Sequence, residues 1–329
     1  MPLIAPSTYR PPFWLHNGHL QTIYPSLFRR VRDVHYQRER ITTPDNDFLD
    51  LDWSTIGSRK LVVLSHGLEG NTYRAYMQGM VRAVNRAGWD ALARNFRGCS
   101  GEPNRLLRFY HSGDTEDLET VIRYVLKKNR YEHIALIGFS MGGNVTLKYL
   151  GERGTSLHPA ICAAVAISVP CDLASSAATL ARPVNKIYMK RFLRMLHQKV
   201  LEKSRQFPGQ ISADGFEKIK SFREFDDRYT APLHGFTDAA DYWQKSSCIN
   251  YLSTLSVPSL LINAQNDPFL SEACFPVQTA REHPNFYLEM PESGGHVGFV
   301  SFNPEGIYWS EQRTISFLND STESGRKRL

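Results

Sequence analysis

The sequence predicts an α/β protein with a mostly parallel central sheet, helices on both faces of the sheet and an inserted helical cap. Three observations support this prediction. Short apolar runs, typical of buried strands, alternate with amphipathic helical patterns up to about residue 170. The alternation breaks over residues 171–255 and resumes with an apolar run near residue 259. One of the apolar runs leads directly into a serine between glycines and then into a helical pattern.

The bulk composition is that of an ordinary globular protein. The 329 residues are 42% hydrophobic and 22% charged, which allows a sizeable core. The five cysteines are widely spaced and odd in number, which argues against a disulfide framework or a zinc site and fits a reducing compartment. The sequence shows no signal-peptide pattern and no apolar run long enough to span a bilayer. We therefore expect a cytoplasmic protein.

The formal net charge of +6 raises the question of anionic partners. The basic residues are scattered and do not alternate with aromatic residues in one block, so we expect no nucleic-acid binding. Residues 186–205 hold a local concentration of basic side chains within the expected cap. A weak peripheral membrane contact through this segment is one interpretation, and a solvated helix face is the alternative. The sequence gives no indication of oligomeric state.

The first part of the chain combines an irregular segment with a predicted hairpin. Residues 1–32 are rich in aromatic residues and proline and too apolar for a linker, so we expect an arm packed on the core. Residues 33–53 alternate between apolar and polar positions and contain a turn cluster at residues 43–47, which predicts an antiparallel hairpin. The following strands are expected at residues 61–64 and 90–96, with a helix at 73–87 between them.

The next segments continue the alternation and then interrupt it. A helix with Leu118, Val121, Ile122 and Val125 on one face precedes the strand that carries the glycine-flanked serine. A crossover between parallel strands needs only about 30 residues, so the long, largely helical stretch that follows is interpreted as an insertion. The expected organisation is an arm at residues 1–32, a core at residues 33–170 and 256–320, a helical cap at residues 171–255 and a frayed polar tail at residues 321–329.

The stretch Gly138-Phe139-Ser140-Met141-Gly142 has the layout of a nucleophile elbow, in which a sharp turn between a strand and a helix exposes a serine hydroxyl. Such a turn strains the serine backbone and leaves no room for side chains at the flanking positions, which explains the glycines. The alternative is a glycine-rich turn with a bystander serine.

A serine nucleophile needs a base and a residue that orients the base. His296 lies among Gly294, Gly295 and Gly298 after the last predicted strand and is the candidate base. Asp267, just past the strand near residue 260, is the candidate acid, and Asp172 is the alternative. These residues follow the order serine, acid, histidine.

The developing oxyanion needs two backbone N–H groups aimed at one point. Met141, directly after the serine, supplies the first candidate, and Leu68 in the loop after residues 61–64 supplies the second. Gly67 would let the Leu68 amide turn inward, and the second amide could instead belong to a residue next to Leu68. The neighbouring His66 is interpreted as a brace of this loop and not as a base.

These motifs together resemble the YheT-like branch of the α/β-hydrolases. The resemblance spans residues 10–320 and rests on the elbow and on five other stretches: Trp14-Leu15-His16-Asn17-Gly18-His19-Leu20-Gln21-Thr22, His66-Gly67-Leu68-Glu69-Gly70, Asn95-Phe96-Arg97-Gly98-Cys99-Ser100-Gly101, Asn263-Ala264-Gln265-Asn266-Asp267-Pro268 and Gly294-Gly295-His296-Val297-Gly298-Phe299.

The resemblance implies an α/β-hydrolase fold and a cytosolic or membrane-associated carboxylesterase or lipase-like serine hydrolase. Members of the branch include bacterial candidate esterases, lipid-acting animal relatives and yeast alcohol acyltransferases. By this resemblance Ser140 is the nucleophile, Asp267 the acid and His296 the base. The substrate does not carry over, because members of the branch differ in the cap.

We therefore expect hydrolysis of small-molecule carboxylic esters, with short- to medium-chain or lipid-like acyl groups, through an acyl-Ser140 intermediate. No metal or organic cofactor is expected for this chemistry. Two alternatives remain. The same triad could transfer an acyl group to an alcohol, or the chain could be a non-catalytic binding protein on a hydrolase scaffold.

Overall fold

The computed structural model describes residues 3–326, with side-chain environments up to residue 321. Nine strands form one sheet in the order β1-β9-β8-β7-β6-β4-β5-β3-β2. The pairs β2–β3 and β3–β5 are antiparallel and the other pairs are parallel, which confirms the predicted α/β class and the predicted hairpin. The strands are β1 (Leu3–Ile4), β2 (Gln37–Thr42), β3 (Phe48–Ser54), β4 (Lys60–Ser65), β5 (Asp90–Arg94), β6 (His133–Phe139), β7 (Ile161–Ile167), β8 (Ser259–Ile262) and β9 (Phe286–Glu289).

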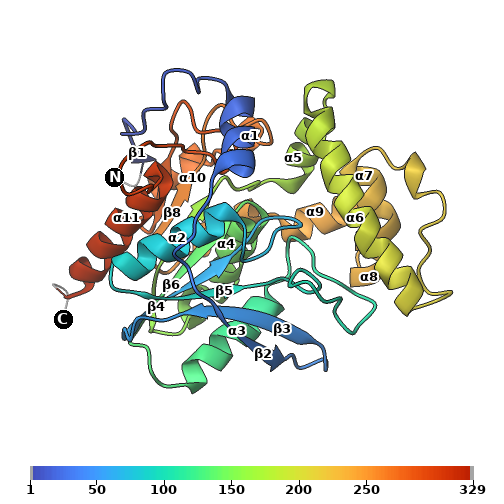
Figure 1. Ribbon diagram of the computed structural model, residues 1–329, viewed down its shortest axis with the longest axis horizontal. Coiled ribbons are helices and arrows are strands. Elements are labelled where there is room, and N and C mark those ends of the chain that lie inside the picture. Colours follow the sequence, from blue (N-terminus) through green and yellow to red (C-terminus); the bar gives the residue numbers. More distant parts are fainter. Residues whose placement is uncertain (1–2, 327–329) are drawn as a thin grey trace.

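Helices cover both faces of the sheet (Figure 1). Alternate residues of β4 point to opposite faces, so that Leu61 and Val63 belong to one apolar cluster and Val62 and Leu64 to the other. The helices α3 (Glu116–Lys127), α4 (Met141–Arg153) and α10 (Val277–Glu282) contribute to the first cluster. The helices α2 (Ala75–Arg86) and α11 (Trp309–Arg326) contribute to the second. The sheet is therefore buried on both faces, which accounts for its nearly continuous apolar strands.

A helical insertion connects β7 to β8 and lies on the right of Figure 1. Its apolar side chains form two clusters of their own, and Phe109 and Phe269 from neighbouring core segments join one of them. The division into arm, core, cap and tail stays a prediction. The helices of the insertion are α5 (Leu173–Leu180), α6 (Lys186–Gln206), α7 (Phe222–Phe225), a π-helical turn (Asp226–Thr230), α8 (Ala231–His234) and α9 (Ala239–Ser246).

The N-terminal segment contains two elements that the sequence did not predict. Strand β1 adds to the edge of the sheet beside β9, and α1 (Gly18–Phe28) is a regular helix. Asn17 caps α1 by accepting hydrogen bonds from the backbone N–H groups of His19 and Leu20. The pattern was missed because α1 buries the polar Gln21 and exposes the apolar Leu20 and Phe28, the reverse of an ordinary amphipathic helix.

Helix α11 continues to Arg326, into the segment expected to fray. Residues 1–2 of the expected arm and residues 327–329 of the expected tail lie outside the described residues. Among the helices between residues 3 and 326, none combines the length and the apolar character that crossing a membrane requires.

Candidate active site

Ser140 occupies a strained turn between β6 and α4. Its φ and ψ angles are 52° and −121°, in a region that residues with side chains rarely adopt. A Cβ atom at Gly138 would lie 2.3 Å from the carbonyl oxygen of Gly142, and one at Gly142 would lie 2.4 Å from that of His66. Only glycine fits these two positions, and this lack of space explains why glycines flank Ser140 in the sequence.

Ser140, His296 and Asp267 form a continuous hydrogen-bonded chain. The Ser140 Oγ lies 2.9 Å from His296 Nε2, and His296 Nδ1 lies 2.8 Å from Asp267 Oδ2. The Asp267 side chain is fully buried, and its other oxygen accepts a hydrogen bond from the backbone N–H of Phe269. A carboxylate only accepts hydrogen bonds, so Nδ1 carries the proton and Nε2 is left free to accept the serine proton.

The alternative acid, Asp172, is not brought to the histidine. Its side chain caps α5 and accepts a 2.7 Å hydrogen bond from the backbone N–H of Ser175. The Asp172 carboxylate therefore stabilises the start of a helix in the insertion.

The loop after β4 leaves one backbone amide unused next to Ser140. The Gly67 N–H donates to Tyr76 Oη at 3.0 Å, and the Glu69 N–H donates to Tyr110 Oη at 2.9 Å. The Leu68 N–H between them has no acceptor among the described residues. The Met141 N–H stands at the first turn of α4, where a helix supplies no acceptor. Leu68 and Met141 line the same pocket as Ser140.

His66 is held as a neutral brace of this loop. Its Nδ1 lies 2.7 Å from the carbonyl oxygen of Gly67, and its Nε2 accepts a 3.1 Å hydrogen bond from the backbone N–H of Phe96. Burial lowers the pKa of the His66 imidazole to about 3. With both nitrogens engaged and the ring fully buried, His66 has no access to a reacting atom.

Two side chains of α1 hold the loops that carry Asp267 and His296, the candidate acid and base. The buried Gln21 Oε1 accepts hydrogen bonds from the backbone N–H of Gly294 at 2.8 Å and from Asn266 Nδ2 at 2.9 Å. The Thr22 Oγ1 accepts a 2.8 Å hydrogen bond from the backbone N–H of His296. Sequence reasoning missed this role, although two adjacent polar residues in an apolar segment were a signal for it.

Close backbone contact makes this arrangement possible. A Cβ atom at Gly18 would lie 2.0 Å from the carbonyl oxygen of Asn266. A Cβ atom at Gly295, whose φ is 60°, would lie 2.6 Å from the carbonyl oxygen of Gly18. Glycine at both positions lets α1 touch the acid loop and the histidine loop at once.

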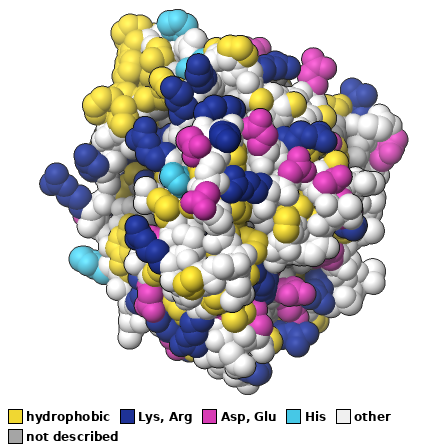
Figure 2. All heavy atoms as spheres, turned by 90° about the vertical axis from the view of Figure 1, so that its right-hand side faces the viewer, with side chains coloured by type: hydrophobic (Ala, Val, Ile, Leu, Met, Phe, Trp, Pro, Cys, Tyr) yellow, Lys and Arg dark blue, Asp and Glu magenta, His cyan; other side chains and the backbone are white. Residues whose placement is uncertain are grey.

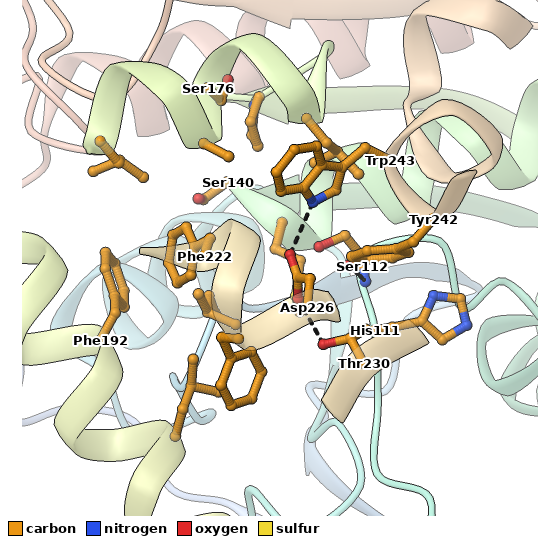
Figure 3. A pocket seen from close by; sticks show the side chains of 18 of the residues that line it. His111, Ser112, Ser140, Ser176, Phe192, Phe222, Asp226, Thr230, Tyr242 and Trp243 are labelled. Atoms are coloured by element: carbon orange, nitrogen blue, oxygen red, sulfur yellow. Dashed lines mark hydrogen bonds between the residues drawn. The ribbon is translucent and has the colours of Figure 1, made fainter. Parts of the chain in front are cut away.

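A pocket between the insertion and the core leads to Ser140 (Figure 3). One polar group stands out in its wall. The Asp226 carboxylate, in the π-helical turn, accepts hydrogen bonds from Trp243 Nε1 at 2.8 Å and from Thr230 Oγ1 at 2.6 Å. Burial raises the pKa of the Asp226 carboxyl to about 7. The rest of the wall is mainly apolar and includes Phe109, Leu173, Leu180, Phe192, Leu196, Phe222 and Phe225.

A second pocket reaches Ser140 and His296 from the side of α1. Arg74 and Arg191 contribute to its wall, together with Leu27 and Met195. Ser140 thus lies where two pockets of different character meet. In residues 3–326 no group of three or more His, Cys, Asp and Glu side chains is arranged to hold a metal ion.

Comparisons with known proteins identify the family of the chain. A family model described as the alpha/beta hydrolase fold matches residues 60–301. The chain is similar to YheT, a candidate esterase of Escherichia coli (strain K12), with 34% identity over 94% of this chain and 92% of YheT. It is also similar to the phospholipase ABHD3 of Homo sapiens, with 32% identity over 94% of this chain and 77% of that protein.

Solved structures show the same fold. An esterase of Pyrococcus furiosus is similar with a TM-score of 0.58 and 24% sequence identity, over 89% of this chain and 96% of that chain.

Proposed function

This chain belongs to the α/β-hydrolase family, within its YheT-like branch, and on that basis we propose that it is a serine hydrolase of carboxylic esters. The observation that carries the proposal is the chain of two hydrogen bonds from Ser140 through His296 to Asp267. Two of the similar proteins are named as an esterase and a phospholipase, and both names support the proposal of ester hydrolysis.

In the proposed reaction His296 Nε2 takes the Ser140 proton while Oγ attacks the ester carbonyl carbon. The oxyanion that forms accepts hydrogen bonds from the Leu68 and Met141 amides. Asp267 holds the imidazole in the required tautomer and stabilises its protonated form. His296 then gives its proton to the departing alkoxide, which leaves an acyl group on Ser140. His296 then takes a proton from a water molecule that attacks this acyl group, and it returns that proton to Ser140 Oγ as the acid is released.

The two pockets suggest how the ester is divided. We assign the acyl chain to the pocket that contains Phe222 and Trp243, because its wall is mainly apolar. We assign the alcohol portion to the pocket that contains Arg74 and Arg191, where charged side chains are more frequent. This division fits an ester with a short- to medium-chain or lipid-like acyl group.

The test is a panel of p-nitrophenyl esters of increasing acyl length, combined with labelling by a fluorophosphonate. Replacing Ser140 with Ala removes the nucleophile, so we expect labelling to vanish and kcat to fall by at least about 10⁴-fold. The matched control is Ser156→Ala, which removes an exposed hydroxyl in the turn after α4. Labelling or turnover that survives in Ser140→Ala would exclude Ser140 as the nucleophile.

The second pocket also leaves room for an alcohol acceptor in place of water. Products formed with an acyl thioester or ester donor in the presence of ethanol distinguish the two reactions. Free acid as the sole product supports hydrolysis, and an ethyl ester supports acyl transfer by the same residues. Ester binding without labelling or turnover in the wild-type protein would instead support a non-catalytic binding protein, an alternative that the intact Ser140–His296–Asp267 contacts disfavour.

A further inference from the structure

The outward face of α1 is apolar. Leu20, Leu27 and Phe28 are 49%, 54% and 64% exposed, and with the half-buried Tyr24 they follow the i, i+4, i+7, i+8 spacing of one helical stripe. The helix contains no Asp, Glu, Lys or Arg. A helix on the surface of a water-soluble protein normally places charged side chains on its outward face, so this stripe indicates a surface that meets something other than water.

Aromatic side chains from two loops extend the stripe. The Trp14 ring stacks on Phe302 at a centroid distance of 5.9 Å and meets Tyr24 edge-on at 5.0 Å. Phe302 is 59% exposed, and Phe13, next to Trp14, is 93% exposed. These contacts join the loop residues and α1 into one continuous apolar area.

The N-terminal end of α6 lies beside α1 and adds both apolar and basic side chains. His19 Nδ1 lies 3.0 Å from Tyr188 Oη, and the two rings are stacked, so the helices touch at this point. Next to Tyr188, Ile187 is 71% exposed, and Val184 is 67% exposed. No carboxylate side chain occurs between residues 182 and 201, whereas that stretch contains the exposed Arg182, Lys186, Lys190, Arg191 and Arg194.

We call the surface formed by the outward side of α1, the loop residues Phe13, Trp14 and Phe302, and the N-terminal end of α6 the α1–α6 face. Figure 2 shows hydrophobic side chains gathered at the upper edge of the molecule, with Lys and Arg side chains beside them. The five exposed basic residues between residues 182 and 201 form no ion pair with any described carboxylate. Leu27 and Arg191 also line the second pocket, so this face borders an entrance to Ser140.

We propose that the α1–α6 face docks on an anionic lipid bilayer and presents the second pocket to it. Apolar and aromatic side chains enter the boundary between headgroups and acyl chains, and the basic residues pair with anionic headgroups. A second copy of the chain fits this face less well, because a two-fold contact would bring the unpaired cations of both copies together. The proposal goes beyond ester hydrolysis, since docking is a binding property that needs no turnover.

The first experiment measures sedimentation of the full chain with vesicles of phosphatidylglycerol and phosphatidylcholine, or of phosphatidylcholine alone, at low salt. We expect the wild type to bind the anionic vesicles. The triple variant Phe13→Ser, Phe28→Ser, Ile187→Ser should bind at least about 100-fold more weakly, because it withdraws three large apolar side chains from the lipid. The matched control is Ile56→Ser, which removes a 52%-exposed apolar side chain next to the amino end of β4. Its binding should equal that of the wild type.

The second experiment removes charge from α6. The variant Lys190→Gln, Arg194→Gln should bind anionic vesicles about 10- to 30-fold more weakly, because each cation contributes about fivefold to binding. Added salt should also weaken the binding of the wild type. Neither residue lines the two pockets at Ser140. Hydrolysis of a water-soluble ester should therefore stay unchanged, which shows that the variant is folded.

Vesicle binding is also measured with Ser140→Ala, so that a failure of the proposed reaction cannot be mistaken for a failure of docking. A wild-type chain that remains in the supernatant with anionic vesicles overturns the proposal. Equal binding by the wild type and the triple variant overturns the assignment of this face. A concentration-dependent dimer that the triple variant dissociates, without vesicle binding, identifies a second copy as the occupant and also overturns it.

Discussion

Gln21 and Thr22 connect the candidate acid and base to a helix far away in the sequence. The Gln21 side chain bonds to both loops, and the Thr22 hydroxyl accepts the backbone N–H of His296 while it donates to the carbonyl oxygen of Gly18. A displacement of about 1 Å in a reacting group lowers a rate by about 100-fold. Both residues are therefore positioning residues for His296, since neither touches a reacting atom.

This role can be tested by removing the Thr22 hydroxyl. In Thr22→Val the His296 N–H loses its acceptor, so we expect kcat to fall about 10- to 100-fold with KM nearly unchanged, and Thr22→Ser to restore it. The measurement is the pH profile of kcat and KM with a soluble ester. The control is Thr120→Val, because Thr120 makes the same bond to a preceding helical carbonyl on the exposed side of α3. If Thr22→Ser is as slow as Thr22→Val, the hydroxyl is not what positions His296.

Asp226 places an ionisable group in the wall of the mainly apolar pocket at Ser140. Burial raises the pKa of this carboxyl from its ordinary value of 3.8 to about 7. Below about pH 4 the carboxyl is neutral in both the folded and the unfolded chain, and ionisation then favours the unfolded chain as the pH rises toward 7. The stability that the neutral Asp226 carboxyl preserves is thus fully present at low pH and is lost as the pH rises toward 7.

Asparagine has nearly the same shape as the neutral acid and does not ionise. We expect Asp226→Asn to be more stable than the wild type, with a difference that widens by about 2 kcal/mol between pH 5 and pH 8. Urea denaturation at several pH values measures it. Asp214→Asn, which removes a carboxylate at an exposed position in the same insertion, is the control. A difference for Asp226→Asn that is independent of pH would show that the carboxyl ionises normally.

At the scale of elements, Arg97 joins the hairpin β2–β3 to the helix α3. Its guanidinium bonds to both oxygens of Asp117 at 2.8 and 2.7 Å, to Asp47 at 3.1 Å and to Asp45 at 2.9 Å. The side chains of Arg97, Asp47 and Asp117 are almost completely buried. Within the Asn95–Gly101 motif, Arg97 therefore has a structural role and takes no part in chemistry at Ser140.

Removing Arg97 leaves two buried carboxylates without a cation. We expect Arg97→Met to lower the free energy of unfolding by about 3–5 kcal/mol, as found when one partner of a buried ion pair is removed. The control is Arg59→Met, which breaks an exposed ion pair with Glu132 and should cost at most about 1 kcal/mol. Both values come from urea denaturation. Equal losses for the two variants would contradict the argument from burial.

The regular elements of the sheet could be predicted because local pattern and tertiary environment agree there. Strand β4 is apolar at every buried position, and α3 follows the spacing of a helix packed on one side. Helix α1 could not be predicted in the same way, because the burial of Gln21 depends on partners near residues 266 and 294. A polar residue that is buried for a distant contact gives no local periodicity.

At the scale of the molecule, the candidate site combines segments from across the chain. Chain order and the glycine pattern pointed to Ser140 and His296 and left Asp172 as an alternative to Asp267. The structure joins Ser140, His296 and Asp267 by hydrogen bonds. The pocket wall could not be selected from sequence. Asp226 and Trp243 of the insertion and Phe269, which follows β8, line one pocket with Ser140 although they lie far apart in the sequence. Periodicity predicts which face of a helix is buried, and it does not predict what that face meets.

The bond from the His296 amide to Thr22 spans 274 positions of sequence. During synthesis at about 5–20 residues per second, roughly 14 to 55 seconds separate the appearance of these two residues. Ser140 is made well before His296, so a nascent chain carries the candidate nucleophile before the candidate base. Until residues 294–296 have left the ribosome, Gln21 and Thr22 lack the backbone N–H groups that they bind in the folded chain. Under the proposed function, the order of translation therefore delays the onset of ester hydrolysis until the fold is nearly complete.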